Sequence, residues 1–337
     1  MWGLEMPRHN NNCFDTIRHF AALLVLFSHH YVLSGFSEPH IPKLETFGGV
    51  GVIIFFSISG YLIAQSAMRS QSFIDFMEKR CRRIFPALLP YSILLYFVLS
   101  AWLYKGSYLE YITSHGVKSF ISTITLRGDE TSNLAQGFIV KGSMNGSLWT
   151  LPLEFACYLI SSIVIIFNKR KEVFFILFIS FMFLSILYII DNPHRAIFAV
   201  PLDHFSIRAM CFFLGASLSM SADAWNHTKV KLTIMIALLL YTLSTFGTII
   251  DYRISAYLLI TITTIFIGVS FKDRLVKGKF DFSYGIYIYA FPVQQIVINK
   301  MTLGFYEGMV VSMVITTGIA AISWNFVEKR FLRNKKI

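Results

Sequence analysis

The chain has 337 residues, of which 55% are hydrophobic and 15% charged, and its mean hydropathy is +0.59. These values lie outside the usual range of soluble globular proteins and indicate a membrane protein. The formal net charge of +11 does not indicate nucleic-acid binding, because the basic residues fall in short loops between apolar segments, where they report membrane orientation.

The four cysteines show no CxxC or other metal-ligand spacing, so we expect neither a disulfide nor a metal site. They are Cys13, Cys81, Cys157 and Cys211. The start of the chain has no short apolar core followed by a small-residue cleavage site, so no removable signal peptide is predicted.

Ten apolar segments are long enough to cross the hydrocarbon core of a bilayer as helices. They are residues 14–33, 47–67, 84–103, 149–167, 173–190, 202–220, 232–250, 254–271, 283–299 and 306–327. We therefore predict an all-α polytopic membrane bundle of about ten transmembrane helices, forming a single domain over residues 1–337. The glycines of FGGVGV and the Phe291-Pro292 pair could break or kink the second and ninth helices.

Lys and Arg residues set the orientation. The N-terminal segment, the even-numbered loops and the tail hold 21 of them, and the odd-numbered loops hold 8. Both termini are therefore predicted to be cytoplasmic, with a basic cytoplasmic tail over residues 328–337. The longest outer loop, residues 104–148, is then placed to cover or shape an acceptor site.

Arg18 and His29 lie in the first apolar segment with ten residues between them. Eleven steps of about 100° place both side chains on one face of a helix, about 16 Å apart along its axis. A cation and an imidazole on one stripe of a membrane helix suggest a functional site, and Asp15 is spaced to pair with Arg18. In the alternative, Arg18 is an interfacial anchor and His29 reaches the outer headgroups; spacing leaves both open.

Arg80 and Arg83, with Arg82 between them, lie at the cytoplasmic entrance to the third predicted span. Guanidinium groups bind phosphate well, so a phosphate-bearing donor could dock there. The positive-inside rule explains the same cluster without any ligand.

Glu154 lies a few residues into the fourth predicted span, at a depth similar to that of His29. A carboxylate in an apolar span needs a partner, and a Glu154–His29 pair would orient the imidazole as a general base. The alternative is a structural hydrogen bond to a neighbouring helix. Trp149 is placed to anchor at the interface or to contact substrate.

Arg208 is another charged residue within a predicted span. It could pair with Glu154 or Asp203, or it could contact substrate. Tyr287, Tyr289 and Gln294 of the ninth span either line a polar cavity or bond between helices, and the second interpretation is preferred. These three residues lie in the segment YGIYIYAFPVQQ.

Six motifs, in this order, make the chain resemble the acyltransferase-3 family of integral membrane acyltransferases over nearly its whole length. They are FDTIRHFAALLVLFSHH, GVGVIIFFSISGYLI, RCRRIFP, SLWTLPLEFACYL, FSYGIYIYAFPV and WNFVEKRF. Two positions depart from the family pattern: Ile53 stands where an Asp is common, and Ala290 where a His is common. These departures make acceptor specificity less transferable.

The resemblance implies transfer of an acyl group, commonly acetyl from acetyl-CoA, to a hydroxyl of a glycan or lipid-linked saccharide. By motif, it assigns Arg18 and His29 to the conserved pair, Arg80 and Arg83 to the RxxR motif, and Glu154 to the Trp/Glu motif. The chain matches the short form of the family, without an appended extracytoplasmic domain.

The sequence therefore predicts an O-acetyltransferase of the cell inner membrane that acts on a surface glycan such as O-antigen or capsule. In this hypothesis, Arg18, Arg80 and Arg83 bind the acetyl-CoA phosphates, and His29 with Glu154 is catalytic. Trp149 and Arg208 are assigned to the acceptor. No metal and no nucleic acid are expected, and membrane lipids surround the chain. A secondary transporter or a non-catalytic membrane subunit remains an alternative, because intramembrane charges also form substrate paths.

Overall fold

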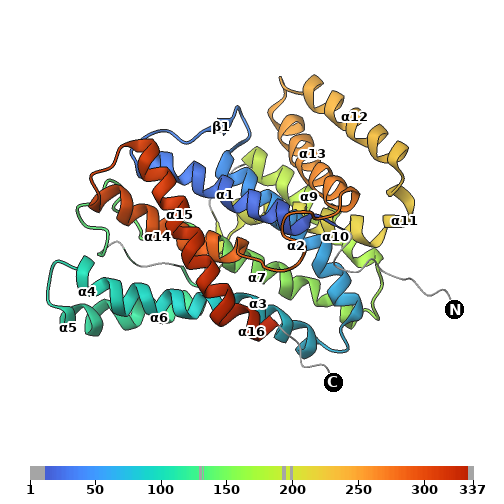
Figure 1. The fold of residues 1–337 in the computed structure, drawn as a ribbon. Coiled ribbons are helices and arrows are strands. Elements are labelled where there is room, and N and C mark those ends of the chain that lie inside the picture. The colour runs from blue at the N-terminus through green and yellow to red at the C-terminus, as the bar shows by residue number, and fades with distance from the viewer. Residues whose placement is uncertain (1–11, 129–130, 132, 192–194, 198–199, 333–337) are drawn as a thin grey trace.

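The structure is a computed structural model that describes residues 12–128, 131, 133–191, 195–197 and 200–332. It is a helical bundle with two short β-hairpins (Figure 1). The first half of the chain forms α1 (Phe14–Leu33), β1 (His40–Ile41), β2 (Glu45–Thr46), α2 (Phe47–Arg69), α3 (Phe73–Ile93), the π-helical η2 (Leu94–Leu99), α4 (Ser100–Leu103), α5 (Tyr108–Tyr111), η3 (Ile112–Gly116), α6 (Val117–Ile124), α7 (Thr150–Ser161) and α8 (Ile163–Ile166). The second half forms α9 (Glu172–Asp191), β3 (Ala196–Ile197), β4 (Val200–Pro201), α10 (Leu202–Met220), α11 (Ala222–Trp225), α12 (Thr228–Ser244), α13 (Ile249–Ser270), α14 (Ser283–Lys300), α15 (Phe305–Ser323), η4 (Trp324–Glu328) and α16 (Lys329–Leu332).

Each of the ten apolar segments is mainly helical, and the all-α prediction is confirmed for the described residues. Two segments are interrupted within their length. Helix α12 ends at Ser244, so that residues 245–248 of the segment 232–250 are a turn before α13, and Ser162 separates α7 from α8 within the segment 149–167.

The two segments that glycine or proline could have broken are continuous helices. The side chain of Thr46 accepts a hydrogen bond from the Gly49 amide at 3.1 Å and so caps the glycine-rich start of α2. Pro292 lies within α14 without ending it. Of the predicted basic tail, residues 333–337 lie outside the described residues.

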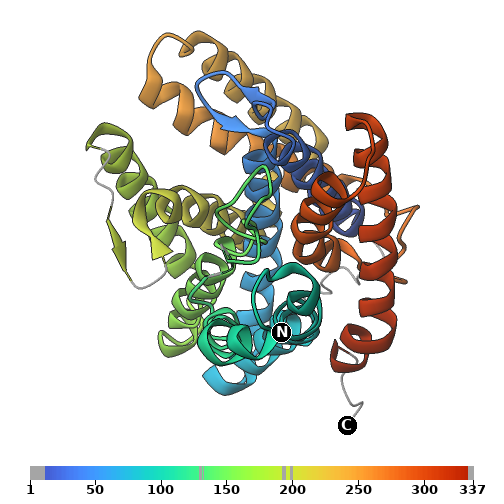
Figure 2. The ribbon, with the colours of Figure 1, turned by 90° about the vertical axis from the view of Figure 1, so that its left-hand side faces the viewer.

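Helix α2 lies at the centre of the bundle, where it packs against α1, α7, α10 and α13 (Figure 2). Its closest neighbour is α10. A Cβ atom on Gly60 of α2 would lie 1.8 Å from the carbonyl oxygen of Phe212, and one on Gly215 of α10 would lie 2.2 Å from that of Ser57. Only glycine fits at these two positions, because the two backbones approach so closely that any Cβ atom would clash.

Five helical stretches among the described residues are long and apolar enough to cross a membrane. They are Phe47–Arg69, Phe73–Leu103, Glu172–Asp191, Ile249–Ser270 and Phe305–Leu332. Large apolar side chains on outward faces are exposed, as Phe183 of α9 (61%) and Leu240 of α12 (61%) illustrate. In a soluble protein such surfaces would aggregate, and in a bilayer they contact lipid. The chain is a membrane protein.

The long segment between α4 and α7 begins with helices and ends without them. Its first part, α5, η3 and α6, packs against α3 and η2. The described residues of its second part form no helix and lead to α7, which Figure 1 shows below α1. This second part brings loop residues to the C-terminal end of α1.

Candidate active site

His29 is half-buried near the C-terminal end of α1. Its Nδ1 atom lies 3.5 Å from Oγ of Ser147, and its ring meets the Phe291 ring edge-on with centroids 5.2 Å apart. The carboxylate of Glu38, in the loop after α1, interacts electrostatically with the imidazole. An imidazole with a hydroxyl and a carboxylate beside it is equipped to accept and return a proton.

Residues 139–148, just before α7, are fastened to α14. Nε2 of Gln295 donates hydrogen bonds of 3.0 and 2.9 Å to two carbonyl oxygens of this segment. The hydroxyl of Tyr287 donates to the carbonyl oxygen of Ser147 at 2.9 Å. These bonds hold the Ser147 hydroxyl beside His29.

Glu154 lies on α7 and its carboxylate points to α2. It accepts hydrogen bonds from the hydroxyl of Ser59, at 3.1 Å, and from that of Tyr158, one helical turn further along α7. The structure does not join Glu154 to His29 within the described residues, so the predicted hydrogen-bonded pair is not formed. The sequence indicates the depth of Glu154 and His29 along their helices but not the direction in which each side chain points. The rotation of α7 about its axis turns the Glu154 carboxylate to α2.

Arg18 and Arg83 meet at a carboxylate that the sequence did not single out. Asp281, in the loop before α14, forms an ion pair with Arg18 at 3.1 Å and accepts a hydrogen bond from Arg83 at 2.7 Å. Arg18 also pairs with Asp15, as its spacing on the helix predicted. The hydroxyl of Ser283 donates to Asp281 at 2.5 Å. The structure thus joins α1 and α3 to the start of α14.

Asp281 is 7% exposed. Burial alone would raise the pKa of its carboxyl group, but the guanidinium groups of Arg18 and Arg83 and the Ser283 hydrogen bond outweigh that effect and hold this pKa well below its usual range. The carboxylate is therefore charged at neutral pH, and it balances one of the two cations.

Arg80 lies apart from this pair. Its guanidinium donates to the Ser66 hydroxyl at 3.2 Å and lies 5.6 Å from the ring centre of Phe76 and 5.9 Å from that of Tyr158. Its Nε atom is buried and has no hydrogen-bond partner. Glu154 interacts with Arg80 electrostatically. Arg18 also has a buried Nε without a hydrogen-bond partner, but its guanidinium is paired with Asp15 and Asp281. Arg80 differs from Arg18 and Arg83 because it forms no ion pair within the described residues and lies beside a hydroxyl and two rings.

Arg208 is 3% exposed on α10 and pairs with Glu45 of β2 at 2.8 Å. The predicted partners Glu154 and Asp203 do not fill this role. Tyr257 donates to the same Glu45 carboxylate at 3.1 Å, and the half-buried Trp149 ring lies 5.5 Å from the guanidinium. Trp149 and Arg208 are therefore brought together, with a carboxylate that links α10, α13 and the hairpin before α2.

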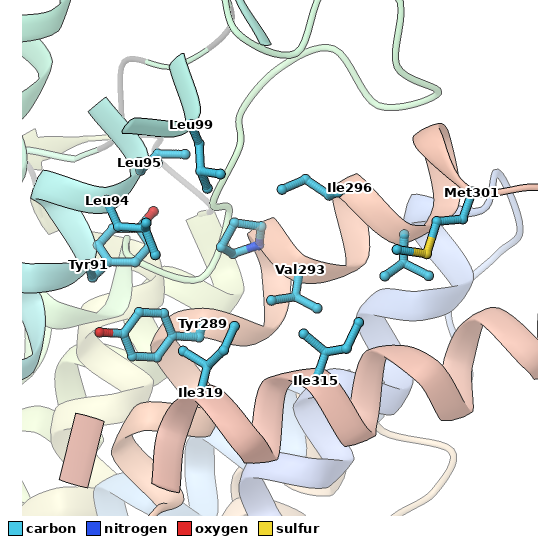
Figure 3. A pocket seen from close by; sticks show the side chains of 12 residues that line it. Tyr91, Leu94, Leu95, Leu99, Tyr289, Val293, Ile296, Met301, Ile315 and Ile319 are labelled. Carbon is cyan, nitrogen blue, oxygen red and sulfur yellow. The ribbon is translucent and has the colours of Figure 1, made fainter. Parts of the chain in front are cut away.

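Tyr287 and Gln294 bond between helices, as preferred from the sequence. Gln294 Nε2 donates to the Leu26 carbonyl oxygen at 2.8 Å. Tyr289 lines a cavity of about 190 Å³ between η2, α14 and α15, shown in Figure 3. This cavity is apolar, because its other lining side chains are aliphatic apart from Tyr91. Tyr289 therefore does not mark a polar cavity.

Sequence reasoning missed four polar residues of these clusters. They are Glu38, Glu45, Ser147 and Asp281. The three acidic residues share one signal: each lies in a short connection directly beside an apolar span, in a chain with only 19 acidic residues. Among the described residues, no three or more His, Cys, Asp or Glu side chains gather as a metal site would require.

Comparison with known proteins identifies the family of the chain. The acyltransferase-3 profile, described as an acyltransferase domain, matches residues 11–326. An O-acetyl transferase of Shigella phage Sf6 is 47% identical over 324 residues, covering 96% of this chain and 97% of that protein. Nodulation protein 10 of Rhizobium leguminosarum bv. viciae is 27% identical over 349 residues, covering 95% and 93%. No solved structure matches the chain.

A match over nearly all of the chain, together with a relative of almost half identical sequence, shows the family. The chain belongs to the acyltransferase-3 family and is a membrane acyltransferase.

Proposed function

We propose that the protein is an O-acetyltransferase that moves acetyl from acetyl-CoA to a hydroxyl of a surface glycan, such as O-antigen, capsule or a lipid-linked saccharide. The similarity to a protein named O-acetyl transferase supports acetyl as the group transferred. The observation that carries the proposal is the half-buried His29 beside Ser147, at the opposite end of α1 from the arginine cluster.

The donor phosphates bind at the arginine end. Arg80 contributes a guanidinium with a free Nε beside Ser66. Arg18 and Arg83, which are paired with Asp15 and Asp281, contribute two further guanidinium groups. Arginine suits this task because its planar fork matches phosphate oxygens. The helix rise from Arg18 to His29, about 16 Å, is on the scale of the pantetheine arm, so the thioester reaches His29. Glu154 helps to hold Arg80 in place.

Transfer takes place at His29. The neutral imidazole removes the proton of the acceptor hydroxyl while that oxygen attacks the thioester carbonyl carbon. The carbon–sulfur bond then breaks, and the imidazolium returns its proton to the departing thiolate. The products are an acetyl ester and free CoA thiol. Trp149 and Arg208 line the acceptor side, since Trp149 lies two residues from Ser147 in the chain.

The protein spans the cell inner membrane with about ten helices and with both termini in the cytoplasm. The excess of Lys and Arg in alternate loops supports this orientation. It places the arginine cluster at the cytoplasmic face, where acetyl-CoA is available, and His29 in the outer half.

Two measurements test the proposal. Deletion in the host is expected to remove one O-acetyl resonance from the NMR spectrum of surface glycans, and the wild-type protein is expected to restore it. Purified wild-type protein is expected to release CoA thiol from acetyl-CoA only when acceptor is present, whereas a transporter would release none.

The matched variants are His29→Ala and His40→Ala. His29→Ala is expected to lower the rate by about 10²–10⁴-fold, the usual contribution of a general base. His40 is exposed, so its variant controls for the loss of an imidazole at the surface. Full activity of His29→Ala would exclude His29 as the base.

A further inference from the structure

The loop after α1 folds back on the end of that helix and carries a carboxylate to it. The hydroxyl of Ser28 donates a hydrogen bond of 2.5 Å to Oε2 of Glu38. Ser28 is fully buried and immediately precedes His29. Glu38 thus lies against the same turn of α1 as the imidazole.

The first turn of α2 closes this contact from the other side. A Cβ atom on Gly48 would lie 3.3 Å from Cβ of Ser28 and 3.6 Å from Oε2 of Glu38. The glycine therefore leaves room for the carboxylate, and the close fit limits its movement. The helix N-terminus beside it also favours a negative charge.

The other groups that contact His29 carry no charge. Ser147 comes from the segment before α7 and Phe291 from α14. Glu154 is bonded to Ser59 and Tyr158, and Glu45 to Arg208. Among the described residues, Glu38 is the charged group that interacts electrostatically with the imidazole.

We infer that Glu38, held by Ser28, is the positioning residue of His29 and stabilises the imidazolium that forms when the acceptor hydroxyl loses its proton. The inference rests on the proposed role of His29. Glu38 takes the role at His29 that was predicted from the sequence for Glu154. Glu38 contacts no reacting atom and acts through the charge of its carboxylate.

The test measures the protonation of His29 directly and needs no acceptor. Full-length protein in lipid nanodiscs is treated with diethyl pyrocarbonate, which modifies neutral imidazole, and the modification rate of His29 is followed by mass spectrometry across pH. A neighbouring carboxylate favours the imidazolium, so its removal shifts the midpoint of this curve to lower pH. Below the wild-type midpoint, Glu38→Gln is expected to react about tenfold faster, the size of a one-unit shift. Exposed His40 provides an internal standard.

Two comparisons make the result specific. Glu154→Gln is expected to keep the wild-type midpoint, and Glu38→Asp to restore most of the shift. Should Glu38→Gln fail to fold, Ser28→Ala releases the carboxylate and is expected to move the midpoint in the same direction. An unchanged midpoint in the variant that folds, or an equal shift in Glu154→Gln, overturns the inference. A different result would contradict the proposed function: wild-type protein that releases no CoA thiol from acetyl-CoA when acceptor is present.

Discussion

The arginines of the site differ in whether a carboxylate already balances their charge. Arg18 and Arg83 share Asp281, and Arg208 has Glu45. Arg80 donates to a neutral hydroxyl and, among the described residues, forms no ion pair with a carboxylate. A phosphate gains most where the cation is not yet paired, because it then adds a bond without displacing one. Arg80 is therefore the residue at which donor affinity is expected to respond most directly.

Replacing Arg80 by Gln is expected to raise the KM for acetyl-CoA by about tenfold or more, with a smaller effect on kcat. The reason is the loss of a hydrogen bond to a charged group, worth about 1.5–3 kcal/mol. Steady-state release of CoA thiol at varied acetyl-CoA measures both constants. Arg82→Gln is the control, since Arg82 is exposed and paired with Glu78 at 2.5 Å. Equal KM values for the two variants would contradict this assignment.

Three elements are tied together at Asp281. Its carboxylate forms ion pairs with Arg18 of α1 and Arg83 of α3, and it lies two residues before Ser283, where α14 begins. Breaking a buried pair leaves the remaining charges without compensation, which costs more than the pair contributes. Stability and donor affinity are therefore linked at this end of the bundle.

Asp281→Asn is expected to destabilise the protein by about 3–5 kcal/mol at neutral pH. Because the pKa of Asp281 is lowered in the folded protein, its stabilisation is complete above about pH 4 and is lost as the pH falls below the ordinary aspartate range. The difference in Tm between wild type and variant should therefore be constant near neutral pH and shrink in acid. Thermal unfolding in detergent at several pH values measures it.

Asp273→Asn is the matched control for that experiment. Asp273 lies in the same connection and accepts a hydrogen bond from Thr16 at 2.9 Å. It has none of the arginine partners of Asp281, so a smaller change in Tm is expected. If both variants lose the same stability, the ion pairs are not the cause.

In the molecule as a whole, the two ends of α1 lie in two different groups of polar residues. Its N-terminal end meets the arginines and Asp281, and its C-terminal end meets Ser147, Phe291 and the Glu38 loop. The central α2 packs against α1 along this length. An acyl group that enters at one end and leaves at the other requires these ends to face opposite sides of the membrane.

The proposed topology is tested by single cysteines in a cysteine-free background. Lys105→Cys, after α4, is expected to react with a membrane-impermeant maleimide in intact cells. Lys277→Cys, between α13 and α14, is expected to react only after the membrane is permeabilised. Mass shift on a gel measures both. Labelling of the second position in intact cells would reverse the orientation and move the arginine cluster away from cytoplasmic acetyl-CoA.

The sequence by itself determined the membrane class, the helical segments and the family. Apolar run length and the order of the motifs are local properties, so they survive without knowledge of packing. The same holds for the pairing of Asp15 with Arg18, which depends on helix periodicity alone.

Only the tertiary structure decided which charges on different elements meet. Helix rotation turns Glu154 to Ser59, and loops carry Glu38, Glu45 and Asp281 to partners far along the chain. Depth along a helix can be counted from the sequence, but its rotation and the course of a loop follow from side-chain packing between elements. The helical placement of Arg18, His29 and Glu154 was therefore predictable, as was the Asp15 partner on the same helix, whereas the carboxylates that other elements bring to Arg83 and Arg208 were not.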